Sequence, residues 1–139
     1  MTINEIQDEI IEEFSMFGDW MEKYENIIEF GKELSPLPVE HRKEENLVKG
    51  CQSQVWLIVK KEGEKLFFIA DSDALISKGI IGLLIRIFSG HTAEEIAKAD
   101  LYSLKEIGLQ EHLSPNRANG LASMVKKIKM YALAYSAVE

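Results

Sequence analysis

The chain has 139 residues, of which 46% are hydrophobic and 28% are charged, and this composition predicts one globular domain spanning residues 1–139. A net charge of −7 disfavours binding to nucleic acid or to an anionic membrane, because both require clustered lysine and arginine. We expect a cytoplasmic protein, because the acidic N-terminus is unlike a secretory signal, the longest apolar stretch is too short for a membrane span, and a single cysteine cannot form an internal disulfide.

Two amphipathic helices are predicted near the N-terminus. The first covers residues 3–16, where isoleucine and phenylalanine recur on one face and acidic residues on the other. Asp19 is a candidate N-cap for the second, with Glu22 at the third position as in a capping box. This helix should end near Gly31. The proline-containing and highly charged residues 34–46 predict a surface loop.

A β-hairpin is predicted in the middle of the chain. Residues 54–60 and 66–70 are rich in β-branched and aromatic side chains, and the segment 61–65 between them centres on Gly63. Cys51 should therefore lie at the end of the first strand that is remote from the turn.

An apolar helix is predicted over residues 74–88. We expect Asp71 and Asp73 to cap its N-terminus, in preference to acting as a pair of catalytic carboxylates. Its two glycines, Gly79 and Gly82, each lower helix propensity by about 1 kcal/mol, and close packing against a neighbouring element would compensate.

Three further helical segments follow. Thr92 and Glu95 form a capping-box pattern before a short helix at 93–99, and another short helical segment covers 101–109. The Ser114-Pro115 pair predicts the start of a long final helix. The order of helices, hairpin and helices predicts an α+β fold with a small antiparallel sheet of two to three strands and about five to six helices.

Cys51 lies in a polar, loop-like segment, whereas a cysteine of the core usually lies within an apolar run. Gly50 permits unusual backbone angles, and Lys49 is a nearby cation that could favour the thiolate. A zinc site made of cysteines or an iron–sulfur cluster needs several thiolates, so a reactive Cys51 would act as a lone nucleophile. An inert, buried thiol is the alternative.

The sequence marks no residue as a catalytic base for Cys51. A cysteine hydrolase requires such a base, yet His41, His91 and His112 have the surroundings of surface or helix-end residues and lack metal-ligand spacing. Arg117 lies in the first turn of the final helix, where a cation opposes the helix dipole, so it needs another partner. Lys78 and Arg86 are expected to extend from their apolar helix to solvent.

Four blocks of the chain resemble, in order and spacing, the SufE family of sulfur-acceptor proteins, which includes the related CsdE branch. The blocks are DWMEKYENIIEFGKEL (19–34), GCQSQVW (50–56), SDALISKGI (72–80) and HLSPNRANGL (112–121). The resemblance covers nearly the whole chain. It implies the α+β fold shared with IscU-type scaffold proteins, in which helices pack around a small antiparallel sheet.

The resemblance also implies a function. Cys51 would accept sulfane sulfur from the persulfide of a SufS-type cysteine desulfurase, stimulate that enzyme, and pass the sulfur to an iron–sulfur scaffold complex. The pyridoxal phosphate cofactor would belong to the desulfurase, and this chain would bind none. Whether the chain is a monomer or a homodimer stays open.

Matches to the family motifs single out further residues. Asp73, Lys78 and Arg117 would position the Cys51 loop or contact the desulfurase. The residues flanking Cys51, namely Gly50, Gln52, Ser53 and Gln54, would serve loop geometry or partner contact. We hypothesise that the thiol rests against apolar side chains and swings out about Gly50 when the partner docks. Three alternatives remain at this point: a thiol hydrolase or transferase, a scaffold with a cluster bridging two chains, and an interaction domain with an inert cysteine.

Overall fold

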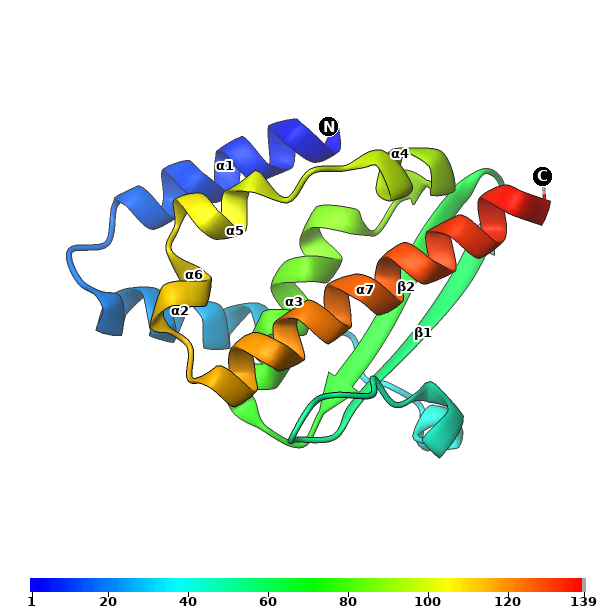
Figure 1. Ribbon diagram of the computed structural model, residues 1–139, viewed down its shortest axis with the longest axis horizontal. Helices are drawn as coiled ribbons and strands as arrows, with labels where there is room; N and C mark the ends of the chain where they lie inside the picture. Colours follow the sequence, from blue (N-terminus) through cyan, green and yellow to red (C-terminus); the bar gives the residue numbers. More distant parts are fainter. Residues whose placement is uncertain (139) are drawn as a thin grey trace.

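Three antiparallel strands and seven α-helices make up residues 1–138, the part of the chain that the computed structural model describes (Figure 1). The expected α+β class is confirmed, and so is the small antiparallel sheet. No helix within residues 1–138 combines the length and the apolar character that a membrane span requires.

The sheet has the order β1-β2-β3. Strands β1 (Val55–Glu62) and β2 (Lys65–Ser72) form a continuous antiparallel ladder, and the short β3 (His91–Thr92) pairs with the start of β2. Both long strands extend further toward the turn than predicted, because the ladder continues to the pair Glu62–Lys65. The connection is therefore only two residues long, and Gly63 supplies its positive φ of 63°.

Alternate residues of the strands enter two different apolar clusters. Val55 and Leu57 of β1 join Leu66 and Phe68 of β2 in the main core, together with the inner faces of the helices. Trp56 and Ile58 point to the opposite side of the sheet, where Leu37 of the preceding loop covers them. This two-residue period fixes the register, since a slip by one residue would exchange the two sets.

The first two helices match the predictions closely. Helix α1 (Ile3–Ser15) begins with a complete capping box between Thr2 and Glu5. Helix α2 (Trp20–Lys32) has Asp19 as its N-cap, and the Asp19 side chain accepts a hydrogen bond from the Glu22 N–H. The reciprocal bond of the predicted capping box, from the Asp19 N–H to the Glu22 side chain, is not formed within residues 1–138. The segment after α2 contains two single 3₁₀ turns, Val39–His41 and Glu44–Asn46.

Helix α3 (Leu75–Phe88) lies in the centre of the molecule and packs against α2 (Figure 1). A Cβ atom built on Gly79 would lie 2.2 Å from the carbonyl oxygen of Ile27, and one built on Gly82 would lie 2.7 Å from that of Phe30. The close packing that was predicted to compensate for the two helix glycines is confirmed, because a side chain at either position would prevent α2 and α3 from approaching so closely.

The expected N-cap of α3 is wrong. Ala74 occupies the N-cap position and provides no side-chain hydrogen bond. Strand β2 continues through Ser72, and its pairing with β1 carries the carboxylate of Asp71 toward Arg42 and Lys78, with which it forms ion pairs. Asp73 is instead directed toward the backbone of Gln54.

Lys78 and Arg86 both reach partners rather than bulk solvent alone. The Lys78 Nζ lies 3.3 Å from Asp71, and Arg86 bridges from α3 to Glu9 and Glu13 of α1. The Arg86 ion pairs join the first and third helices.

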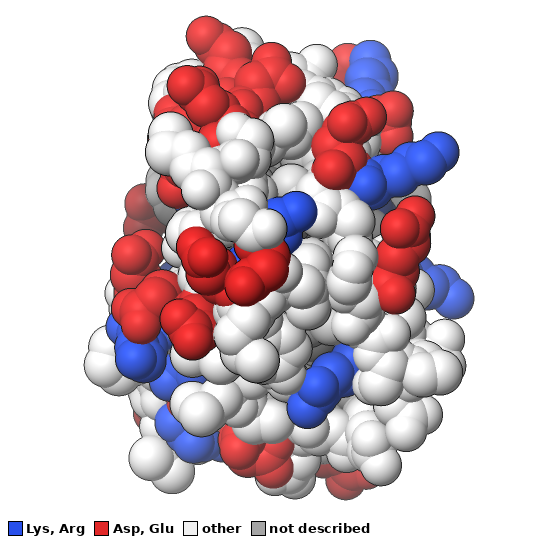
Figure 2. Space-filling view, turned by 90° about the vertical axis from the view of Figure 1, so that its left-hand side faces the viewer, with Lys and Arg blue, Asp and Glu red and all other residues white. Residues whose placement is uncertain are grey.

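Four helices complete the chain. Helix α4 (Ala93–Lys98) has the predicted capping box. The helix predicted at 101–109 is shorter, α5 (Tyr102–Glu106), and a second helix, α6 (Leu109–His112), extends beyond the predicted segment because Gly108 adopts a left-handed conformation with φ 74°. Helix α7 (Pro115–Val138) starts at the predicted Ser114-Pro115 pair and crosses α3 and the sheet (Figure 1). Acidic side chains predominate on the face shown in Figure 2, in keeping with the net charge.

Candidate functional site

The loop that carries Cys51 is held at both of its ends. At the start, the Val48 N–H donates to the Val55 carbonyl at 2.8 Å, and Leu47 forms a bridge with Trp56. Between Val48 and Val55, Gly50 adopts a φ of 96° and passes close to α7. A Cβ atom built on Gly50 would lie 2.4 Å from the Ser123 Oγ. The positive φ and this close approach both favour glycine directly before the cysteine.

The far end of the loop is fixed by the residues that precede α3. The Gln54 N–H donates to the Asp73 carboxylate at 3.0 Å. The Gln54 carbonyl accepts from the Ser72 hydroxyl at 2.7 Å and from the Asp73 N–H at 3.2 Å. Five residues, 49–53, lie between the two anchored ends.

The Cys51 thiol is half-buried and turned inward, where it packs against the edge of the main core. Its Sγ donates to the Gly120 carbonyl oxygen of α7 at 3.6 Å. Burial raises the pKa of this thiol, because the charged thiolate is poorly solvated there. The sequence-based idea that Lys49 favours the thiolate is not supported, since the Lys49 ammonium points to Glu44, 3.9 Å away.

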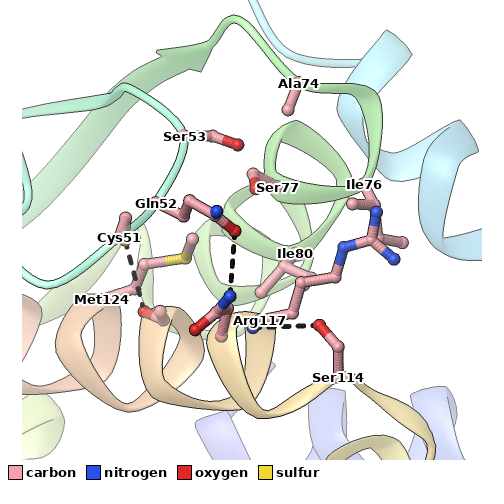
Figure 3. Close-up of a pocket in the computed structure, with 12 residues that line it drawn as sticks. Cys51, Gln52, Ser53, Ala74, Ile76, Ser77, Ile80, Ser114, Arg117 and Met124 are labelled. Atoms are coloured by element: carbon pink, nitrogen blue, oxygen red, sulfur yellow. Dashed lines mark hydrogen bonds between the residues drawn. The ribbon is translucent and has the colours of Figure 1, made fainter.

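A cavity of about 320 Å³ opens in front of Cys51 (Figure 3). Three walls surround it: the cysteine loop, the first two turns of α3 with the preceding Ala74, and the N-terminal part of α7 with the preceding Ser114. The lining residues are Cys51, Gln52, Ser53, Ala74, Ile76, Ser77, Ile80, Ser114, Asn116, Arg117, Gly120 and Met124.

The α7 wall is joined to the cysteine loop and to α2 by side-chain hydrogen bonds. The Asn116 amide donates to the Gln52 side-chain oxygen at 3.2 Å. The Arg117 guanidinium donates to the Tyr24 hydroxyl of α2 at 2.9 Å. The sequence predicts that Arg117 has a partner to offset its position in the first turn of the helix. The structure provides Tyr24, a residue of a different helix, as one such partner.

The structure divides the residues singled out from the sequence into three groups. Cys51, Gln52, Ser53 and Arg117 line the cavity. Gly50, Gln54 and Asp73 lie outside the lining and determine the path of the loop. Lys78 is separate from the cavity lining and pairs with Asp71.

Several cavity residues were missed by sequence reasoning. Ser77, Asn116 and Gly120 each contribute to the lining, as do the apolar side chains of Ile76, Ile80 and Met124. The apolar residues carried no signal because their spacing is that of ordinary core positions. The glycine at position 120, within an otherwise regular helix, was the one available sign of a close contact.

None of the cavity-lining residues is a histidine. His91 is buried and its ring nitrogens contact the carbonyl oxygens of Phe88 and Met1 at 3.3 and 3.0 Å. His112 stacks on Trp20 with 4.1 Å between ring centroids, and His41 lies in the first 3₁₀ turn. The geometry therefore offers no base beside the thiol of the kind that a cysteine hydrolase uses.

Comparisons with known proteins give a consistent result. The family model described as "SufE: Fe-S metabolism associated domain" matches residues 8–132. An "uncharacterized SufE-like protein" of Rhizobium meliloti (strain 1021) is 43% identical over 130 residues, covering 90% of this chain and 93% of that protein. A second, from Rhizobium etli, is 43% identical over 127 residues, covering 88% and 86%.

One solved structure resembles the fold over nearly its full length. It is the solution structure of a hypothetical protein from Thermus thermophilus, with a TM-score of 0.76 and 20% sequence identity. The alignment covers 93% of this chain and 94% of that one. At this identity the likeness supports the fold alone.

Proposed function

The chain belongs to the SufE family, associated with iron–sulfur metabolism, and from this premise we propose that it is a sulfur carrier with Cys51 as the acceptor. Residues 1–139 would form one sulfur-acceptor domain. Cys51 takes sulfane sulfur from the persulfide of a SufS-type cysteine desulfurase, stimulates that enzyme, and passes the sulfur on for cluster assembly. The half-buried thiol, alone at the wall of a cavity without a histidine, is the observation that carries the proposal.

The transfer reaction fits a lone thiol. The Cys51 thiolate attacks the outer sulfur of the desulfurase persulfide, the sulfur–sulfur bond breaks, and the desulfurase cysteine leaves as a thiolate with the electron pair. This is analogous to thiol–disulfide exchange and needs neither an oxyanion hole nor a general base held against the thiol. A hydrolase or transferase, the alternative weighed from the sequence, would need a base that the cavity lining does not provide.

The resting geometry suits the protection of a reactive sulfur. A persulfide is easily oxidised or reduced, and a half-buried position limits its contact with solvent. We propose that docking releases the short segment 51–53 from the α7 wall, with Gly50 as the hinge. The anchors at Val48 and Gln54 confine the movement to the residues between them, 49–53.

The remaining motif residues are assigned roles within this proposal. Gly50, Gln54 and Asp73 maintain the loop, while Gln52, Ser53 and Arg117 face the approaching partner across the cavity. Lys78 would act through its ion pair with Asp71. Asp71 lies in β2 and pairs with Trp56 of β1, the strand that follows the cysteine loop. If Arg117→Ala, in a folded variant, left the stimulation of the desulfurase unchanged, Arg117 would be removed from this group.

The decisive experiment is an intact-mass measurement after incubation with a SufS-type desulfurase and cysteine. Wild type should gain the mass of sulfur in a form that a reducing agent removes. Cys51→Ser, a nearly isosteric variant, is the matched control and should gain nothing. Absence of the adduct from the wild-type protein, with a desulfurase that turns over, would contradict the proposal.

A further inference from the structure

The N-termini of two helices meet at the cavity in front of Cys51 (Figure 3). The first turn of α3 forms one wall and the first turn of α7 forms another. Neither first turn contains an acidic residue, and the N-cap of α3, Ala74, offers no side-chain acceptor. Helix N-termini carry partial positive charge and unpaired N–H groups, so their convergence favours a negatively charged ligand.

Ser77 provides independent evidence for a ligand. Its side chain is only 8% exposed and lines the cavity, where Figure 3 shows it facing the cysteine loop. Within residues 1–138 its hydroxyl has no hydrogen-bond partner, unlike that of Ser72 at the end of β2. The hydroxyl oxygen is itself open to the cavity, where it can donate a hydrogen bond to a group that enters from solvent.

Arg117 adds a full positive charge to the same cavity. One of its N–H groups donates to Tyr24, which leaves the other donors of the guanidinium available. A cation in the first turn of a helix opposes the helix dipole, and a bound anion would turn that repulsion into attraction. Together the donors are those that bind carboxylates: a guanidinium, a hydroxyl and backbone N–H groups.

The cavity is larger than a persulfide needs. Its volume is about 320 Å³, whereas a water molecule in the liquid occupies about 30 Å³. One additional sulfur atom on Cys51 would fill only part of this space. A small organic molecule with several heavy atoms fits beside the thiol.

We propose that this cavity binds the carboxylate of a small thiol acid, and that Cys51 can thereby exchange sulfur with a free thiol. The exchange rests on the proposed function, whereas the carboxylate site does not. In the exchange, the bound thiolate attacks the outer sulfur of the Cys51 persulfide. The sulfur–sulfur bond breaks, the small molecule becomes the persulfide, and Cys51 leaves as a thiolate, so no external oxidant or reductant is required.

The carboxylate site is tested by alkylation of Cys51 with two probes of nearly equal size, iodoacetate and iodoacetamide. The ratio of their rates is compared with the ratio for a free small thiol in the same buffer. The wild-type ratio should favour iodoacetate by about fivefold relative to that reference, as expected for an anion held by helix N-termini and one cation. Added salt should reduce the preference.

Three variants make the test specific. Arg117→Gln and Ser77→Ala should each bring the rate ratio toward that of the free thiol. Lys49→Gln is the matched control, because it also removes a positive charge near Cys51 in the sequence but lies outside the cavity lining. A wild-type ratio at or below the free-thiol value, or equal effects of Lys49→Gln and Arg117→Gln, would overturn the carboxylate site.

The exchange itself is tested by removing sulfur from persulfide-loaded protein with mercaptoacetate or mercaptoethanol at equal thiolate concentration. Mercaptoacetate should react faster with wild type, and Arg117→Gln should abolish the difference. Equal rates with wild type would overturn the exchange. If the protein never acquires sulfur, the proposed function fails, while the alkylation ratio still decides whether the carboxylate site exists.

Discussion

The Cys51 thiol and the Gly120 backbone lie in direct contact across the interface between the cysteine loop and α7, with the Sγ 3.6 Å from the Gly120 carbonyl oxygen. A Cβ atom on Gly120 would lie 3.4 Å from that sulfur, which is an ordinary van der Waals distance. The glycine is thus dispensable for packing the thiol in its resting position. Its absence of a side chain keeps the space beside the sulfur open.

Gly120→Ala should therefore stabilise the protein and hinder its chemistry. Replacing a glycine inside a helix by alanine increases stability by about 1 kcal/mol, which denaturant unfolding would measure. The added methyl group narrows the cavity beside Cys51, so alkylation by iodoacetamide should slow several-fold. Asn119→Ala is the matched control, since it also raises helix propensity but lies outside the cavity lining and should leave the alkylation rate unchanged.

Gly50→Ala should destabilise the cysteine loop. The φ of 96° is unfavourable for alanine, and its Cβ would lie 2.4 Å from the Ser123 Oγ. Together these effects should cost about 1–3 kcal/mol in urea unfolding and should increase the exposure of Cys51 to alkylating agents. Adding Ser123→Ala should recover part of the loss by removing the hydroxyl. A Gly50→Ala protein with wild-type stability would show that the loop has a different resting conformation.

Gly79→Ala should be among the most disruptive single substitutions in the chain. The new methyl group would meet the Ile27 carbonyl oxygen at 2.2 Å, and that oxygen belongs to helix backbone that cannot rotate away. We expect a loss of about 3 kcal/mol or more, by the mechanism of overpacking. Gly18→Ala serves as the control, because the nearest neighbour of its new methyl group would be a flexible Glu22 side chain at 3.5 Å. Similar midpoints of thermal unfolding for the two variants would contradict this packing argument.

The reactivity of Cys51 should depend on pH in a way that reflects its burial. Because burial raises the pKa of the thiol, the alkylation rate of the folded protein should reach half its maximum at a higher pH than that of the urea-unfolded chain. The same shift affects stability. Burial of the neutral thiol contributes stability below the ordinary thiol pKa, and this contribution is lost as the pH rises through the folded-state pKa.

Cys51→Ser is the control for both measurements. The variant should not be alkylated at position 51. Its free energy of unfolding should also decrease less at alkaline pH than that of wild type, because the contribution of the thiol is missing. The burial argument would be contradicted if the alkylation rate of the folded protein reached half its maximum at a pH equal to or below that of the unfolded chain. That result would show that the cavity stabilises the thiolate form of Cys51 relative to its neutral form.

Much of the fold was predictable because its elements have local signals. The Asp19 cap, the Thr92–Glu95 capping box and the Ser114-Pro115 helix start are each decided by hydrogen bonds or φ preferences within a few residues. The prediction for Asp71 and Asp73 was wrong because the strand extends to Ser72 only through its pairing with β1, which is a contact between distant parts of the chain.

The sequence alone determined that Cys51 is a lone thiol in a polar loop preceded by a glycine, and it contained the motifs of the family. Those features depend on residue type and spacing. The tertiary structure decided which groups surround the thiol: the Gly120 carbonyl, the unpaired Ser77 hydroxyl, and Arg117 with Tyr24. Their relation to Cys51 arises from how α2, α3 and α7 pack, because close helix packing and loop anchoring are set by contacts between residues far apart in the chain.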